Sequence, residues 1–187
     1  MAGRRRELPA AARERRAAID DPEAVLAAAL RFLEMRSRSI AEVRRRLTGA
    51  GYQRDLVEGA VERLVELGML DDRAFGAAWV ESRDRARPRG ERALQQELRQ
   101  KGLDRSVIDE LLDERRVDED GQALEPDHAA AERLIQRNAR LLARVTDPRA
   151  RRQRAYALLA RNGFDPETCR EVAARVDDTG EAIPPPE

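Results

Sequence analysis

Cysteine and histidine are almost absent from this 187-residue sequence, which has one of each, Cys169 and His128. The chain can therefore form no intramolecular disulfide and no zinc site built from several cysteine and histidine ligands. It has no glycine-rich phosphate loop, and its carboxylates follow the pattern of solvated helix faces. We therefore expect no enzymatic activity, no metal and no cofactor, with His128 at the surface and Cys169 in a core.

Long apolar runs and aromatic side chains are also scarce. No apolar stretch approaches the roughly 20 residues that a membrane-spanning helix needs, and the Arg-rich start lacks the apolar block of a signal peptide. Aromatic residues make up 3% of the chain and charged residues 39%. This balance favours packed helices with solvated faces over a β-sandwich, so we expect a soluble, cytoplasmic, all-α protein.

Three glycines, Gly51, Gly102 and Gly163, each follow a helix-like pattern, at intervals of 51 and 61 residues. Glycine in this position suits a left-handed helix cap. Apolar residues recur at the same distances from each glycine: Leu47, Leu98 and Leu159 lie four residues before it, and Ala60, Leu111 and Val172 lie nine residues after it. This spacing predicts two short helices that pack on each other around a glycine turn.

A further helical pattern precedes each pair, over residues 23–34, 73–85 and 128–144. The residues expected to face inward are Val25, Ala29, Leu30 and Leu33, then Phe75, Ala78 and Trp79, then Ala131, Leu134, Ile135, Leu141 and Leu142. Capping signals agree with these limits, because Asp-Pro pairs begin at Asp21, Asp147 and Asp165, and Ser39 with Glu42 forms a capping box. The unit is therefore three helices, present three times.

This periodicity predicts three helix-turn-helix-like repeats with distinct flanking segments. The repeats span residues 21–69, 70–116 and 128–177. Residues 1–20 are expected to be a flexible Arg-rich segment, 117–127 an acidic linker or hinge, and 178–187 a disordered Pro-rich tail.

The formal net charge is zero, from 36 basic and 36 acidic residues, but the charges are not mixed evenly. Residues 109–132 carry 2 basic and 10 acidic residues, whereas residues 133–161 carry 9 basic and 1 acidic. Basic blocks largely cover the first two helices of each unit, and acidic blocks mostly fall on the third. A helix-turn-helix protein reads duplex DNA with its third helix, which phosphates would here repel, so that function is disfavoured.

Several segments together resemble the RecX family of recombination regulators. They are Arg36 to Val43 with Leu47 and Gly51, then Leu67 to Phe75 with Trp79 and Val80, then Arg89-Gly90 leading to Glu97 through Leu103. The strong match covers residues 24–115, and the third repeat keeps the apolar spacing.

The resemblance implies a bacterial regulator of DNA repair and recombination that is built as an elongated, curved array of three-helix repeats. Its implied partner is the RecA recombinase, chiefly as the filament on single-stranded DNA, with a weak direct contact to DNA as well. Binding would restrain ATP hydrolysis, strand exchange and filament extension, activities that belong to the SOS response.

Basic residues near helix starts and turns of the matched motifs are the candidate contacts. They are Arg36, Arg38, Arg87, Arg89 and Lys101, and from the third repeat Arg149, Arg151, Arg152 and Arg154. Two other functions stay open: a single-strand nucleic-acid-binding protein that neutralises the backbone, and a helical scaffold for another partner. The clusters could equally be solvated faces that pair with acidic neighbours.

Overall fold

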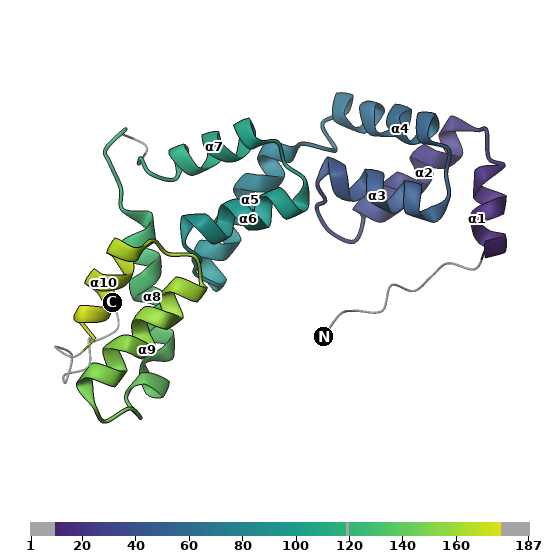
Figure 1. Cartoon of the computed structure of the whole chain (residues 1–187). Helices are drawn as coiled ribbons and strands as arrows, with labels where there is room; N and C mark the ends of the chain where they lie inside the picture. Colours follow the sequence, from purple (N-terminus) through teal and green to yellow (C-terminus); the bar gives the residue numbers. More distant parts are fainter. Residues whose placement is uncertain (1–9, 119, 177–187) are drawn as a thin grey trace. The chain divides into compact units, whose positions relative to one another are not determined.

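The computed structural model describes residues 10–118 and 120–176, which are helical throughout apart from turns and loops (Figure 1). The helices are α1 (Ala10–Ala17), α2 (Pro22–Leu33), α3 (Ile40–Ala50), α4 (Arg54–Glu66), α5 (Asp72–Ala86), α6 (Glu91–Lys101), α7 (Arg105–Glu114), α8 (Pro126–Leu142), α9 (Pro148–Arg161) and α10 (Pro166–Ala174). The only β-type pairing within these residues is an isolated bridge between Val117 and Ala123. None of the described helices is long and apolar enough to span a membrane. The predicted all-α fold is confirmed.

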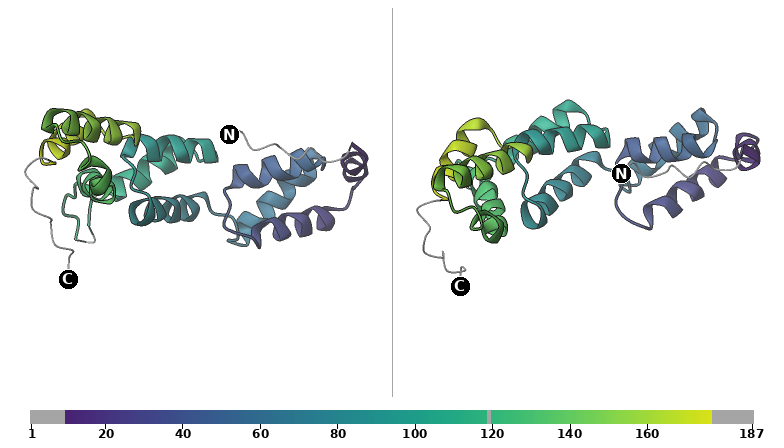
Figure 2. Two further views of the ribbon diagram at one scale, coloured as in Figure 1. Left: turned by 90° about the horizontal axis from the view of Figure 1, so that it is seen from below. Right: turned by 60° about the horizontal axis from the view of Figure 1, so that its bottom comes forward.

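The helices form three groups of three, α2–α4, α5–α7 and α8–α10, as the glycine spacing predicts (Figure 2). By their contacts the residues divide into two compact units. One unit comprises Met1–Phe75 with Lys101–Asp104, and the other comprises Gly76–Gln100 with Arg105–Glu187. The turn between α6 and α7 therefore packs with the first repeat, whereas most of the second repeat packs with the third.

The first repeat encloses a core of aliphatic side chains. Val25 from α2, Val43 and Leu47 from α3, and Val57 and Leu64 from α4 are at most 2% exposed. The Asp21 carboxylate accepts the Glu23 N–H at 3.0 Å and so caps α2, while Ser39 and Glu42 form the predicted capping box of α3. Each cap satisfies amide groups that have no acceptor within their own helix.

The second repeat buries Phe75, Val80, Leu94 and Ile108. Two residues of α5 differ from the expected inward face, because Ala78 is exposed and Trp79 is only half-buried. The Trp79 indole N–H donates to the Glu97 carboxylate at 2.8 Å. An indole N–H needs an acceptor when it is removed from water, and Glu97 on the surface of α6 provides one outside the apolar core.

The third repeat has two small apolar clusters. Ala131, Leu159 and Cys169 are completely buried in one of them, so the predicted core position of Cys169 is confirmed. Leu142 is 3% exposed, but its neighbour Leu141 is 53% exposed, in contrast to the expectation for that residue. Adjacent helical residues point about 100° apart, so the two leucines cannot both face one core.

Residues 10–17, expected within a flexible segment, form helix α1, which packs against α3. The Gln53 side-chain amide donates to the Ala17 and Ile19 carbonyls at 3.1 and 2.9 Å, and the Arg16 guanidinium lies 6.0 Å from the centre of the Tyr52 ring. These are polar and cation-π contacts, which an apolar spacing pattern does not reveal. Residues 1–9 lie outside the described residues.

The acidic segment 117–127 forms an ordered turn in its described part. The Leu124 N–H donates to the Arg116 carbonyl at 2.6 Å, and the Asp118 carboxylate accepts the Gln122 N–H at 2.7 Å. Helix α8 begins at Pro126, two residues earlier than expected, because proline fits the first turn of a helix, where no amide donor is needed. The tail predicted for residues 178–187 lies outside the described residues.

Candidate partner-binding surface

Three of the predicted contact residues lie around the start of α3. The Glu42 carboxylate accepts hydrogen bonds from Arg36 and from Lys101, each at 3.0 Å. The Ser39 hydroxyl donates to the Lys101 carbonyl at 2.6 Å. Because this carbonyl lies at the end of α6, these bonds hold Lys101 beside residues more than 50 positions earlier in the chain. Arg36, Arg38 and Lys101 therefore belong to one basic group.

Arg38 occupies a different environment in this group. Its guanidinium lies 4.2 Å from the centre of the Phe32 ring, and the Arg46 guanidinium lies 5.6 Å from the same ring. Within the described chain, the buried Nε of Arg38 has no hydrogen-bond partner. Burial lowers the pKa of Arg38, and the nearby positive charges of Arg36 and Arg46 lower it further. The site thus holds like charges together beside an aromatic ring.

Arg87 and Arg89 lie in the second compact unit and differ from one another. The Arg87 side chain is exposed, and in the described part of the chain it has no hydrogen-bond or ion-pair partner. Arg89 is half-buried, lies 3.4 Å from a Glu97 carboxylate oxygen and donates to the Asn162 side-chain oxygen. Arg89 therefore joins the second repeat to the third, whereas Arg87 is available to a partner.

The arginines of α9 do not form one face. At 100° per residue, Arg151 and Arg152 flank the buried stripe of Ala155 and Leu159, whereas Arg149 and Arg154 point away from it. Arg151 Nε donates to the Val145 carbonyl at 3.0 Å and so holds the loop before the helix. Arg149 and Arg154 are exposed and make no side-chain hydrogen bond or ion pair within residues 10–118 and 120–176. They are the better candidates for a contact.

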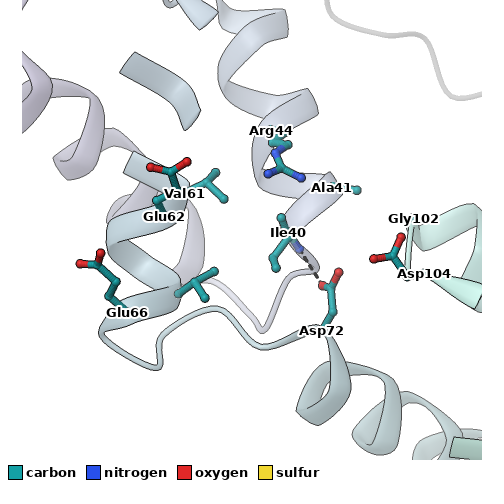
Figure 3. Close-up of a pocket in the computed structure, with 10 residues that line it drawn as sticks. Ile40, Ala41, Arg44, Val61, Glu62, Glu66, Asp72, Gly102 and Asp104 are labelled. Atoms are coloured by element: carbon teal, nitrogen blue, oxygen red, sulfur yellow. Dashed lines mark hydrogen bonds between the residues drawn. The ribbon is translucent and has the colours of Figure 1, made fainter. Parts of the chain in front are cut away.

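An acidic groove of about 400 Å³ lies in the first compact unit (Figure 3). Its apolar lining includes Ile40 and Val61, and acidic residues surround this lining: Glu62, Glu66, Asp72 and Asp104. The Ile40 N–H donates to the Asp72 carboxylate at 2.8 Å, the bond drawn in Figure 3. The acidic face of α4, which its charge pattern predicts, therefore lines this groove through Glu62 and Glu66.

The remaining candidates for chemistry have ordinary structural roles. His128 is 17% exposed and lies 3.5 Å from a Glu132 oxygen and 4.0 Å from a Glu171 oxygen. His128 is therefore more buried than the surface position expected for it, because it lies on α8 facing Glu171 of α10. Burial raises the pKa of the Cys169 thiol, which keeps it protonated. Among the described residues, no group of three or more His, Cys, Asp or Glu side chains is arranged to hold a metal ion.

Two important acidic partners and one arginine were not predicted from the sequence as site residues. Glu42 and Glu97 organise the basic groups of the first two repeats, and Arg115 bridges Asp84 and Asp127 with distances of 2.6 to 2.9 Å. Alignment of the repeats on their glycines could have indicated Glu97, because the residue at the same position of the first repeat is Arg46. Nothing in the spacing distinguishes Arg115 from the exposed Arg116 that follows it.

Glu42 provides a test of the basic group at α3. Burial raises the pKa of Glu42, but the bonds from Arg36 and Lys101 outweigh it, so the pKa of Glu42 in the folded protein lies below its ordinary value. A depressed carboxyl pKa contributes stability above the unfolded pKa and loses it as the pH falls through the folded pKa. Glu42→Gln keeps the capping box but removes the charge. It should cost about 1 kcal/mol near neutral pH, since Arg36 is half-exposed and screened.

Urea unfolding at neutral and acidic pH measures this difference between Glu42→Gln and the unmodified protein. The cost should shrink as the pH falls from the ordinary carboxyl pKa to the lower pKa of folded Glu42, below which neither protein carries the charge. A cost that is the same at both pH values would contradict the charge-based account of Glu42. Glu58→Gln is the control, because Glu58 pairs with Arg44 at 2.8 Å in a more exposed setting.

Comparison with known proteins places these features in a family. Three RecX family models match in chain order: the first three-helix domain over residues 26–64, the second over 71–112 and the third over 125–173. Similar proteins are named regulatory protein RecX. That of Mycobacterium sp. (strain JLS) is 36% identical over 146 residues, covering 76% of each chain, and that of Chlorobium phaeobacteroides (strain BS1) is 32% identical over 148 residues, covering 79% of this chain and 90% of the relative.

Two crystal structures of RecX proteins share the fold. One, described as regulatory protein RecX, has a TM-score of 0.68 at 22% identity and covers 82% of this chain and 71% of that chain. The other, RecX from Lactobacillus salivarius, has a TM-score of 0.69 at 18% identity and covers 84% of this chain and 97% of that chain. With all three domain models matched in order and relatives more than 30% identical over most of its length, this chain belongs to the RecX family of regulatory proteins.

Proposed function

We propose that this protein binds the RecA recombinase, chiefly as its filament on single-stranded DNA, and inhibits ATP hydrolysis, strand exchange and filament extension. The observation that carries the proposal is the presence of all three RecX three-helix domains, in order, in one chain. A cytoplasmic location, where the DNA is, belongs to the same proposal.

The charge arrangement supports a partner with both protein and DNA surfaces. The group of Arg36, Arg38 and Lys101 and the exposed arginines of α9 offer positive charge, while the groove beside Glu62 and Glu66 offers negative charge. A filament of protein on DNA presents phosphates as well as basic and acidic side chains, so each surface has a complementary target. The elongated, curved shape implied by the family resemblance stays a prediction.

The direct test is RecA ATP hydrolysis on single-stranded DNA, with this protein added below the RecA concentration. We expect inhibition at these ratios, and we expect it where binding of this protein to free DNA is undetectable. No inhibition at any ratio would refute the proposal. Inhibition that follows the titration of free DNA and fades steeply with salt would instead indicate a nucleic-acid-binding protein.

The arginines of α9 provide a test of the binding surface. Replacing Arg149, Arg151, Arg152 and Arg154 together by alanine should weaken filament binding and leave the helices folded. Since Arg151 also holds a loop, the sharper variant is Arg149→Ala with Arg154→Ala. We expect about tenfold weaker binding, equivalent to about 1.4 kcal/mol, because exposed ion pairs contribute up to about 1 kcal/mol each.

The matched control is Arg140→Ala with Arg144→Ala, which removes two exposed charges from the same basic block without touching α9. Binding is measured by titration of preformed filaments, and helix content by circular dichroism. Equal affinities for the two double variants would remove Arg149 and Arg154 from the contact surface.

A further inference from the structure

The first two repeats place different side chains at the same positions. The glycines Gly51 and Gly102 are 51 residues apart, and this interval relates Ala28, Phe32, Arg38 and Arg46 to Trp79, Arg83, Arg89 and Glu97. In the second repeat all four of these side chains belong to one contacting group, and in the first repeat Phe32, Arg38 and Arg46 do. The two repeats can therefore be compared position by position, because equivalent positions hold side chains of different charge.

In the second repeat this group is partly neutralised by an acid of its own. The Glu97 carboxylate accepts from Arg83 at 2.6 Å and from the Trp79 indole at 2.8 Å, and lies 3.4 Å from Arg89 Nε. The Arg83 guanidinium also covers the Trp79 ring at 4.2 Å. One carboxylate, Glu97, therefore pairs with both arginines and also accepts the indole N–H of Trp79.

In the first repeat the acid is replaced by an arginine and the indole by a methyl group. Arg46 stands where Glu97 stands in the second repeat, and Ala28 stands where Trp79 does. Arg38 and Arg46 both approach the Phe32 ring. The neighbouring Glu42 carboxylate is already shared by Arg36 and Lys101. Among the described residues, no further acid pairs with Arg38 or Arg46.

An oxyanion from outside the chain would complete this arrangement. The Nε atoms of Arg38 and of the equivalent Arg89 are both buried without a hydrogen-bond partner in the described chain, but Arg89 Nε lies 3.4 Å from a Glu97 oxygen, whereas Arg38 has no ion-pair partner among the described residues. The planar guanidinium offers a fork of donors that matches a phosphate or carboxylate. Stacking on Phe32 holds this fork in place at little entropic cost, so the site is preorganised for an anion.

We propose that Arg38 and Arg46, held over Phe32, form a binding site for a phosphate group of the single-stranded DNA backbone. A DNA backbone is favoured over a single protein carboxylate, because it presents a row of negative charges to a group of several cations. Arg36 and Lys101 share the single carboxylate of Glu42, and Arg38 and Arg46 add two further positive charges over Phe32, which suits a polyanion. The site does not rest on the proposed function, since it needs no RecA.

The test uses the full chain, without RecA, and a fluorescently labelled oligothymidylate whose binding is followed by anisotropy. Arg46→Glu installs at the first repeat the acid that the second repeat already has, so the fold accommodates it and Arg38 gains an internal partner. We expect about tenfold weaker DNA binding. The slope of log affinity against log salt concentration should become shallower by about 0.7, which corresponds to the loss of one phosphate contact on single-stranded DNA. Arg45→Glu is the charge-matched control, on the same helix but a different face, and should weaken binding only about twofold.

A second variant separates the guanidinium geometry from its charge. Arg38→Lys keeps the positive charge but loses the planar fork, so binding should weaken about fivefold with an unchanged salt slope. In nuclear magnetic resonance spectra, the Arg38 Nε–H signal should shift on addition of the oligothymidylate or of inorganic phosphate. Equal binding by Arg46→Glu and Arg45→Glu would overturn the site. A shift of the Arg38 signal with polyglutamate but not with phosphate would overturn the choice of ligand.

The outcome for this site is independent of the outcome for RecA. If Arg46→Glu binds DNA as well as the unmodified protein does while both inhibit RecA ATP hydrolysis, the phosphate site is refuted and the proposed function stands. If RecA is not inhibited by either protein while the DNA affinities differ as expected, the proposed function is refuted and the phosphate site stands.

Discussion

Replacement of Arg115 by alanine should lower the free energy of unfolding by about 3–5 kcal/mol, the range typical when one partner of a buried ion pair is removed. The Arg115 side chain is 6% exposed. Its Nε and Nη2 donate to the two Asp84 oxygens at 2.9 and 2.8 Å, and its Nη1 donates to Asp127 at 2.6 Å. Without Arg115, two largely buried carboxylates that belong to α5 and α8 lose their counter-charge.

The adjacent arginine provides the control for this prediction. Arg116 is 50% exposed and pairs with Glu91 and Asp113, so Arg116→Ala removes the same charge at a cost of at most about 1 kcal/mol. Urea unfolding of both variants measures the difference. Equal losses for the two variants would show that burial of the Arg115 pairs is not what stabilises this junction.

The cost of Arg115→Ala should also depend on pH. Burial raises the pKa of Asp127, whereas the Glu91 N–H and the Arg115 guanidinium oppose the rise. When Arg115 is removed, the pKa of Asp127 rises further. A carboxyl pKa raised by folding means that the folded state binds the proton more readily, so the variant loses stability as the pH rises through this pKa. The deficit should therefore be largest near neutral pH and smaller in acid, and a deficit that grows in acid would contradict this account.

Gly163→Ala should lower the free energy of unfolding by about 2–5 kcal/mol, through left-handed backbone strain and overpacking together. Gly163 has a φ of +87°, a conformation that side chains disfavour. A Cβ atom there would lie 2.4 Å from the Ala93 Cβ and 2.5 Å from the Ala93 backbone nitrogen. The turn after α9 approaches α6 this closely because the Gly90 N–H donates to the Asn162 carbonyl at 3.0 Å.

Gly68→Ala separates the two contributions to this cost. Gly68 has a φ of +67°, but no atom lies within 4 Å of an added Cβ. Its replacement should cost only the backbone strain of about 1–2 kcal/mol. Thermal unfolding of both variants gives the comparison. If Gly163→Ala were no worse than Gly68→Ala, the close approach of α6 to the turn would not contribute to stability.

The local structure was largely predictable from the order of residue types. Apolar residues at spacings of three and four, acceptors before the first turn and glycine after the last turn predict helices wherever they occur. Gly51, Gly102 and Gly163 all adopt the left-handed conformation expected of them, with φ of +106°, +88° and +87°. These signals act within a few residues, so they are present in the sequence itself.

The candidate site was less predictable, because its charges act between distant residues. Arg36, Arg38 and Lys101 were expected to contact a partner, but only the structure brings Lys101 to Glu42. The four arginines of α9 were expected to act together, yet the helix separates them into two that flank the buried stripe and two that point outward. A count of charges in a segment does not contain these directions.

By itself, the sequence determined that this protein is helical, repeated three times and composed of charge blocks that cancel, because helix periodicity, caps and glycine turns are local properties. The tertiary structure decided which charges are neutralised and which are not. Glu97 pairs with both Arg83 and Arg89, Arg115 is buried between two aspartates, and Arg38 lies over Phe32 without an ion-pair partner within the described chain. The physical reason is that charge pairing depends on distances of a few ångströms between side chains that are far apart in the chain.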